Sequence, residues 1–139
     1  MKTITREDKV AEFHKATKTD VGSQPRASLV QLREKLLIEE CKEVCDELNK
    51  IEMTLTHGKP IERGQWADLL KELCDLQYVL SGTIISFSAI AGSFTPAFNR
   101  VHSSNMSKLD DEGNPVLNSY GKVTKGPNYK APDLEDLVA

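Results

Sequence analysis

The sequence has no surplus of positive charge and no long apolar run, and each of these absences argues against one class of function. Its 18 Lys and Arg residues are outnumbered by 21 Asp and Glu residues, whereas proteins that bind the nucleic-acid backbone usually present a basic face. The longest apolar stretch, near residues 84–91, is interrupted by serine and is too short to span a bilayer. We therefore expect neither a nucleic-acid partner nor a membrane partner.

Cysteine is also scarce, which excludes a disulfide framework. Cys41, Cys45 and Cys74 are odd in number, and no pair has the two-residue spacing of a zinc ribbon. They fall within helical patterns, so we expect reduced cysteines packed in the core of a cytoplasmic protein. No basic-then-apolar leader opens the chain, so we expect no signal peptide. A chain of 139 residues most simply forms one domain over residues 1–139.

The spacing of apolar residues predicts an all-α fold with a four-helix bundle-like core. The predicted helices cover about residues 6–17, 28–55, 61–81 and 95–103. Ser28 is the predicted N-cap of the second helix, and Thr95-Pro96 the predicted start of the fourth. Gly82, after the third helix, is predicted to be a kink or a packing notch. The tail, residues 107–139, contains lysines and glycines and is expected to be irregular.

Two of these helices carry carboxylates beside an apolar stripe. The stripes comprise Leu37, Cys41, Val44, Leu48, Ile51 and Leu55 in the second helix, and Trp66, Leu69, Leu73, Leu76 and Leu80 in the third. At about 100° per residue, Glu40 and Glu43 flank the first stripe, and Glu72 and Asp75 flank the second. If the stripes pack antiparallel, the four carboxylates face one another across a shallow groove.

Carboxylates crowded at the margin of a core repel one another unless a cation lies between them. Oxygen ligands without nitrogen or sulfur favour a hard cation, so we expect Mg²⁺, with Mn²⁺ as an alternative. Three other interpretations compete with a catalytic magnesium site. Acidic helix faces often serve only solubility, and an acidic groove can bind a basic partner without catalysis. A di-iron bundle normally adds Glu-x-x-His motifs, which His14, His57 and His102 do not complete.

The acidic pattern resembles the signature of a known enzyme superfamily. Glu39-Glu40-x-x-Glu43 followed by Glu72-x-x-Asp75 is similar to the motif of the all-α nucleoside triphosphate pyrophosphohydrolases. That group includes MazG, the dimeric dUTPases, the dCTP pyrophosphatases and phosphoribosyl-ATP pyrophosphohydrolase. The segments 101–109 and 121–129 look like the C-terminal part of a phosphoribosyl-ATP pyrophosphohydrolase-like branch.

The resemblance implies a role for each matching residue. Glu40, Glu43, Glu72 and Asp75 would hold Mg²⁺, and Glu39 would orient or deprotonate the attacking water. The implied reaction converts a (deoxy)nucleoside triphosphate to its monophosphate and pyrophosphate. Phosphoribosyl-ATP is the alternative substrate, because nothing in the sequence selects the base.

Side chains outside the acidic motif are candidates for substrate binding. Lys108 and Lys125 would contact phosphate, Asn105 would bind sugar or phosphate, and Gly126 would allow close approach of the backbone. The candidates for stacking on the base are Tyr129, Trp66 and His14. Each also has a structural explanation: loop lysines are usually solvated, Trp66 lies on an apolar stripe, and a lone histidine in a short helix usually serves the fold.

The segment Ile84–Ala91 is apolar nearly all round, which is typical of deep core or of a subunit interface. We favour an interface, because a domain this small has few elements left to cover the segment. The superfamily forms dimers or dimers of dimers, so the resemblance implies a homodimer or homotetramer.

Overall fold

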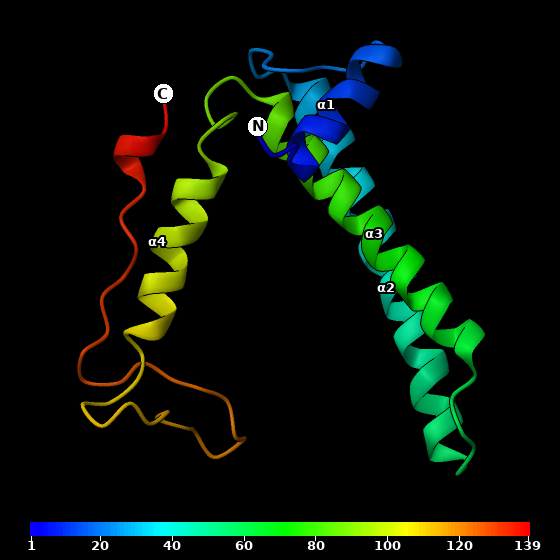
Figure 1. The fold of residues 1–139 in the computed structure, drawn as a ribbon, viewed down its shortest axis with the longest axis vertical. Coiled ribbons are helices and arrows are strands. Elements are labelled where there is room, and N and C mark those ends of the chain that lie inside the picture. The colour runs from blue at the N-terminus through cyan, green and yellow to red at the C-terminus, as the bar shows by residue number, and fades with distance from the viewer. The chain divides into compact units, whose positions relative to one another are not determined.

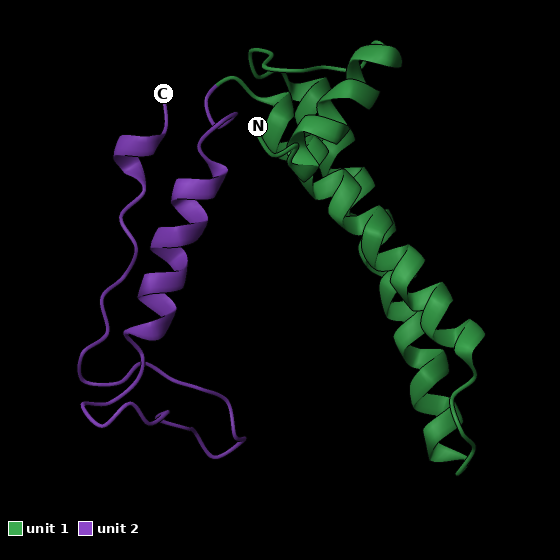
Figure 2. Cartoon of the chain, in the orientation of Figure 1, with its two compact units in different colours: residues 1–88 green, residues 89–139 purple.

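The computed structural model describes residues 1–139 and confirms the predicted all-α fold. Its helices are α1 (Arg6–Ala16), α2 (Ala27–Thr56), α3 (Arg63–Ser86), α4 (Phe94–Met106) and a 3₁₀ turn at Glu135–Leu137 (Figure 1). The chain divides into two compact units, residues 1–88 and residues 89–139 (Figure 2). The expectation of a single domain over residues 1–139 remains a prediction. None of the helices combines the length and the apolar character that a membrane span requires.

The first unit is built on a helical hairpin. α2 and α3 run side by side in opposite directions and are joined by residues 57–62 (Figure 1). Their contact buries Val44, Ile51 and Leu69, and the partly buried Ile61 and Leu76 pack against these three. Val44 and Ile51 are seven residues apart, so they lie two turns apart on the same face of α2. The core of this unit is therefore a narrow seam between two long helices.

α1 packs against α3 near the open end of the hairpin. α1 begins at a capping box, in which Thr5 Oγ1 accepts from the backbone N–H of Asp8 and the Asp8 carboxylate accepts from that of Thr5. Val10 and His14 lie one turn apart on α1, and both are buried. This pair fixes the helix to the hairpin.

Gly82 marks a close approach of side chains to α3, which confirms the packing notch that was one of the two predictions for this position. α3 continues through Gly82 and ends at Ser86. A Cβ atom on Gly82 would lie 2.5 Å from Nη2 of the buried Arg33 and 2.9 Å from Nε2 of His14. Glycine is needed here because any larger residue would displace one of these side chains.

Two predicted helix starts are wrong. α2 has Arg26 at its N-cap, so Ser28 lies inside the first turn, and α4 has Ser93 at its N-cap, so Pro96 lies inside the helix. Neither cap makes a side-chain hydrogen bond to the helix. Both predictions relied on capping side chains, whereas these two helices begin without that stabilisation.

The predicted stripes of α2 and α3 are only partly buried. The hairpin leaves a row of apolar side chains exposed on both helices, and we call this row the apolar side: Ile38, Leu48, Leu55, Trp66, Leu70, Leu73 and Leu80. Cys41, Cys45 and Cys74 are exposed as well, so the expectation of core cysteines is wrong. The reason is geometric: the seam between two helices covers one sector of each, and a stripe of wider angle extends beyond it.

The second unit pairs α4 with the C-terminal segment. The Arg100 guanidinium donates to the carboxylate of Asp136 and to the carbonyl of Asp133, and Ser93 Oγ donates to the carbonyl of Leu137. The backbone N–H of Ala139 donates to the carbonyl of Ala89. These bonds tie the chain end along the length of α4.

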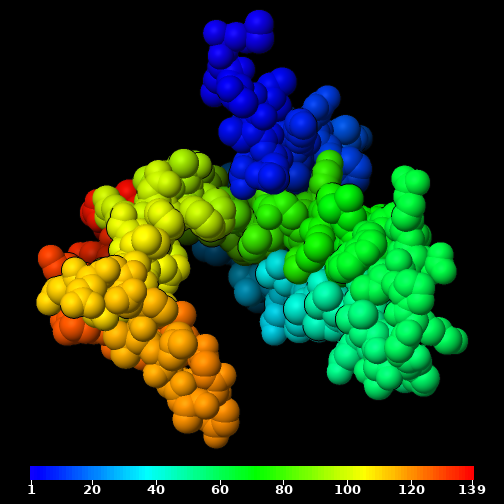
Figure 3. All heavy atoms as spheres, turned by 60° about the horizontal axis from the view of Figure 1, so that its bottom comes forward, coloured from blue at the N-terminus to red at the C-terminus, as the bar shows by residue number.

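The irregular tail is a closed loop between α4 and the C-terminal segment. Ser104 Oγ donates to the carbonyl of Lys130 (2.7 Å), and the Lys130 N–H donates to Ser107 Oγ (2.9 Å). Beyond this closure, a bridge between Leu117 and Val123 forms a short hairpin. In Figure 3 the orange hairpin extends as an arm beyond the yellow atoms of α4. The tail outside this bridge and the 3₁₀ turn is irregular, as predicted for residues 107–139.

Candidate metal centre

The α2–α3 hairpin brings together the four carboxylates of the acidic motif. Glu40, Glu43, Glu72 and Asp75 each offer one oxygen, and these oxygens all lie within 4.8 Å of one another. Glu40 and Glu43 are three residues apart on α2, and so are Glu72 and Asp75 on α3. Residues with this spacing share a helix face, so the two antiparallel helices bring their four carboxylates together. We call these four residues the acidic cluster.

Two oxygens of the acidic cluster are buried without a partner. Oε2 of Glu40 and Oε2 of Glu72 are almost completely inaccessible to solvent and accept no hydrogen bond within the protein. A buried polar atom without a partner costs about 1–3 kcal/mol, and more when it is charged. The donor set therefore fits a hard divalent cation, which would supply a partner for carboxylate oxygens that have none within the protein.

Lys71 lies beside the acidic cluster and contacts both of its α3 members. Its Nζ is 2.7 Å from Oδ2 of Asp75 and 3.3 Å from Oε1 of Glu72. The hydrogen bond to Asp75, together with the bond to Glu72, raises the pKa of the Lys71 ammonium, so the charge is secure at neutral pH. Lys71 is not among the residues predicted from the sequence, although its place four residues before Asp75 is the spacing of a helical ion pair.

The other acidic residues near the motif lie at its edge. Glu39 is exposed to solvent, one residue before Glu40 and further round the helix. Glu47, one turn beyond Glu43, pairs with Lys50 Nζ at 2.8 Å and is not a member of the acidic cluster. The role of Glu39 as the residue that activates water remains a prediction.

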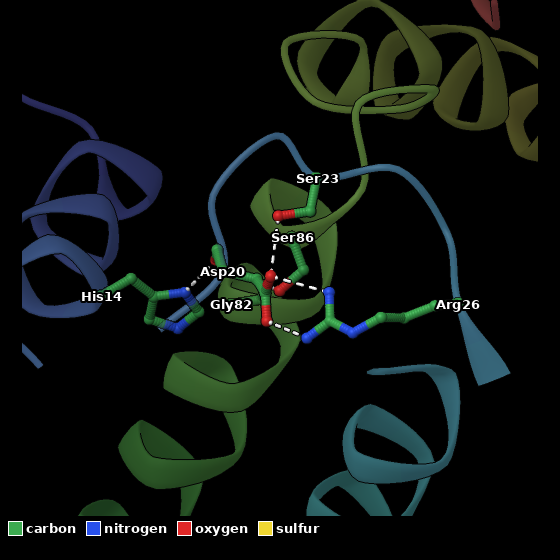
Figure 4. A network of polar contacts seen from close by, with 6 residues as sticks. All are labelled: His14, Asp20, Ser23, Arg26, Gly82 and Ser86. Carbon is green, nitrogen blue, oxygen red and sulfur yellow. Dashed lines mark hydrogen bonds and ion pairs between the residues drawn. The ribbon is translucent and has the colours of Figure 1, made fainter. Parts of the chain in front are cut away.

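His14 is held within the fold. Only 4% of its surface is exposed, and its Nδ1 lies 2.8 Å from the carbonyl oxygen of Asp20 (Figure 4). The Asp20 carboxylate accepts from Arg26 and from Ser23, which lowers the pKa of Asp20 from 3.8 to about 2. The backbone N–H of Ser23 in turn donates to the carbonyl of Ser86, so the loop after α1 is bound to the end of α3. His14 therefore has a structural role.

Trp66 lies on the apolar side of the hairpin, with 53% of its surface exposed. It is therefore not the core residue that its stripe suggested. Six residues rotate a side chain by about 600°, so Trp66 lies about 120° round α3 from Glu72. Its role in base binding remains a prediction.

The remaining candidates for substrate binding all lie in the second unit. Asn105 is in the last turn of α4, and the backbone N–H of Gly126 donates to the carbonyl of Lys108 at 3.1 Å. A Cβ atom on Gly126 would collide with that carbonyl oxygen, so Gly126 serves the closure of the loop. Lys125 Nζ lies 4.9 Å from the ring centre of Tyr129, a cation–π contact. The structure thus gathers Lys108, Lys125, Gly126 and Tyr129 in one loop.

A family model matches this arrangement of helices and carboxylates. The model describes phosphoribosyl-ATP pyrophosphohydrolase, and it matches residues 10–105. The chain belongs to the phosphoribosyl-ATP pyrophosphohydrolase family. This family is part of the all-α, MazG-like pyrophosphohydrolase superfamily that the acidic motif resembles, so the predicted superfamily is confirmed. A search of the curated proteins found no match.

Membership in the phosphoribosyl-ATP pyrophosphohydrolase family makes the protein an enzyme, a hydrolase that acts on phosphorus-containing anhydrides. Its substrate is a nucleotide. The matched residues include all four carboxylates of the acidic cluster and Asn105, and they end before the loop that carries Lys108, Lys125 and Tyr129. The similarity of that loop to the family therefore remains a prediction from the sequence.

Proposed function

We propose that the protein hydrolyses the α–β phosphoanhydride bond of phosphoribosyl-ATP, releasing pyrophosphate and phosphoribosyl-AMP. The observation that carries the proposal is the acidic cluster, with two buried, unpartnered oxygens, inside the region that the family model matches. Nucleoside triphosphates contain the same bond and were the leading expectation from the sequence. The family match favours phosphoribosyl-ATP over them.

Glu40, Glu43, Glu72 and Asp75 are proposed to hold Mg²⁺, with Mn²⁺ as a substitute. Magnesium is the natural choice because an all-oxygen donor set suits it and because it commonly accompanies phosphate chains. When bound, the ion would neutralise phosphate charge and lower the pKa of a nearby water molecule.

Glu39 is proposed to position that water and to accept its proton. The water oxygen would attack the α-phosphorus, the bond from that phosphorus to the bridging oxygen would break, and pyrophosphate would depart with the bond's electron pair. Glu39 suits this role because it is exposed next to the acidic cluster, so its carboxylate is available to substrate and solvent.

Lys108 and Lys125 are proposed to contact the phosphates, and Asn105 the sugar or phosphate. Their support is chemical: the substrate carries several negative charges, and a cluster of four carboxylates alone would repel it. Gly126 is proposed to act through the shape of the loop that it closes. Tyr129, Trp66 and His14 complete the proposed base-binding candidates, of which His14 has the least free surface.

We infer that the protein is a homodimer or homotetramer in a cytoplasmic setting. Helical geometry places the residues of the apolar side between about 90° and 170° round their helices from the acidic cluster. A contiguous apolar face over two long helices is typical of a protein–protein interface. A second copy of the chain would cover the apolar side and leave the acidic cluster accessible.

The test is release of pyrophosphate from phosphoribosyl-ATP and from a panel of dNTPs and NTPs, with Mg²⁺ and with EDTA. We expect release from phosphoribosyl-ATP that EDTA abolishes. Release from a dNTP or NTP alone would overturn the proposed substrate and retain the reaction. Turnover that is equal in EDTA would overturn the proposed role of the acidic cluster. Glu47→Gln is the control variant, since Glu47 lies one turn beyond Glu43 and outside the cluster.

A further inference from the structure

Lys71 contacts two of the carboxylates that would also bind a cation at the acidic cluster. Its ammonium contacts one oxygen of Asp75 and one of Glu72, the two α3 members of the cluster. Two-thirds of the Lys71 side chain (66%) is nevertheless exposed, whereas the Glu72 side chain is only 16% exposed. The lysine therefore approaches the cluster from the solvent.

An ammonium and a divalent cation would compete for the negative charge of these two carboxylates. An oxygen that coordinates a metal has less negative charge to offer a lysine, and two positive charges a few ångströms apart repel each other. The lysine side chain has a flexible four-carbon stem, so its ammonium group can move away from the carboxylates without any change in α3. Lys71 has no other acidic partner.

We propose that Lys71 is an exchangeable counterion of the acidic cluster: it yields the oxygens of Glu72 and Asp75 to the divalent cation and then binds the phosphate chain. The inference rests on the proposed function and adds a residue that the acidic motif does not contain. The phosphates arrive at the cation that displaced the lysine, so the freed ammonium stays within reach of their oxygens. One side chain thus serves both states of the site, with opposite effects on the two ligands.

The test is a pair of titrations on Lys71→Met, which removes the charge and keeps most of the side-chain length. Binding of Mn²⁺ alone is followed by the electron paramagnetic resonance signal of the free ion. We expect Mn²⁺ to bind about two- to fivefold more tightly to the variant, the size of an exposed ion pair. Binding of the manganese–pyrophosphate complex to the Mn²⁺-saturated protein is followed by calorimetry. We expect it to weaken about fivefold or more.

Lys50→Met is the matched control. Lys50 is as exposed as Lys71 (65%) and pairs with a carboxylate at 2.8 Å, but that carboxylate, Glu47, lies outside the acidic cluster. We expect both affinities of this variant to equal those of the unmodified protein. A Lys50→Met variant that changes as much as Lys71→Met would overturn the proposal, because the effect would then reflect net charge.

The outcomes separate this inference from the function beneath it. Unchanged or weaker Mn²⁺ binding in Lys71→Met would overturn the exchange, and unchanged binding of pyrophosphate would overturn the contact with phosphate. In both cases Mn²⁺ binding by the unmodified protein would leave the proposed function intact. An unmodified protein that binds no Mn²⁺ would overturn both.

Discussion

The two sides of the α2–α3 hairpin differ in almost every property, although the same two helices supply both. One side bears the acidic cluster, where four carboxylate oxygens converge within 4.8 Å. The other is the apolar side, where Leu70 is 63% exposed and Ile38 61%. Only a narrow seam around Val44, Ile51 and Leu69 separates them.

Each side raises the free energy of the folded first unit unless a second component binds to it. Like charges gathered on one side raise the free energy of the folded chain unless a cation joins them. Apolar surface left in water on the other side does the same unless another surface covers it, at about 25 cal/mol for each Å². The proposed metal site and the proposed association surface can both lie on this hairpin because neither is buried in its core.

The largest effect should come from changing the acidic side. Glu72→Gln keeps the size of the side chain and removes one charge from the acidic cluster. We expect pyrophosphate release to fall at least about 100-fold, as the loss of a charged group at a reacting centre typically does. The melting temperature in EDTA should not fall, since the variant has less charge repulsion. A lower melting temperature would show that the carboxylate supports the fold instead.

The matched change on the apolar side is Leu70→Glu. A charge placed in a desolvated interface is costly, so we expect the molar mass from light scattering at micromolar concentration to drop to that of one chain. Mn²⁺ binding should remain, because Leu70 lies round α3 from Glu72 and Asp75. Ile4→Glu is the control: Ile4 is 68% exposed and precedes the helices. A monomeric mass for the unmodified protein would contradict the proposed assembly.

A smaller effect is expected at the end of the hairpin, where α1 packs. Gly82→Ala would place a methyl group against Arg33 and His14, and we expect a loss of about 1 kcal/mol in the free energy of unfolding, since overpacking exceeds the gain in helix propensity. Gly64→Ala, in the first turn of the same helix, meets no atom within 4 Å. It should stabilise the protein by up to about 1 kcal/mol in urea unfolding. Equal signs for the two variants would contradict the close packing at Gly82.

The smallest effect concerns the ion pair between Arg26 and Asp20. Because the pKa of Asp20 is lowered from 3.8 to about 2 in the folded protein, the pair contributes stability above pH 3.8 that is lost as the pH falls through about 2. Arg26→Gln should therefore melt at a lower temperature than the unmodified protein at pH 5. The difference should shrink between pH 4 and pH 2. A difference that is constant with pH would exclude this linkage.

The sequence predicted those features that depend on the period of a helix. Glu40 with Glu43, and Glu72 with Asp75, share a face through their spacing alone, and this sufficed to place four carboxylates on two facing helices. The seam at Val44, Ile51 and Leu69 followed from the same period. Spacing does not say how wide the covered sector is, so the burial predicted for Trp66 and for the cysteines was wrong.

Features that depend on contacts distant in sequence could not be predicted. The prediction for Gly82 stayed open between a kink and a packing notch, because the contacts that decide it come from Arg33 and His14 on two other helices. The closure of the tail depends on Ser104 and Lys130, which are 26 residues apart. Lys71 was missed for a different reason: exposed lysines are common, and only the convergence of the carboxylates gives this one a meaning.

The exposed thiols offer a way to follow association of the chain through its native cysteines. Cys41, Cys45 and Cys74 are all exposed on the α2–α3 hairpin, and the chain has no other cysteine. A second copy seated on the apolar side would shield thiols that a single chain leaves open to reagents. The rate at which a thiol-specific dye reacts should then rise on dilution. No label, tag or substitution would have to be introduced to follow assembly.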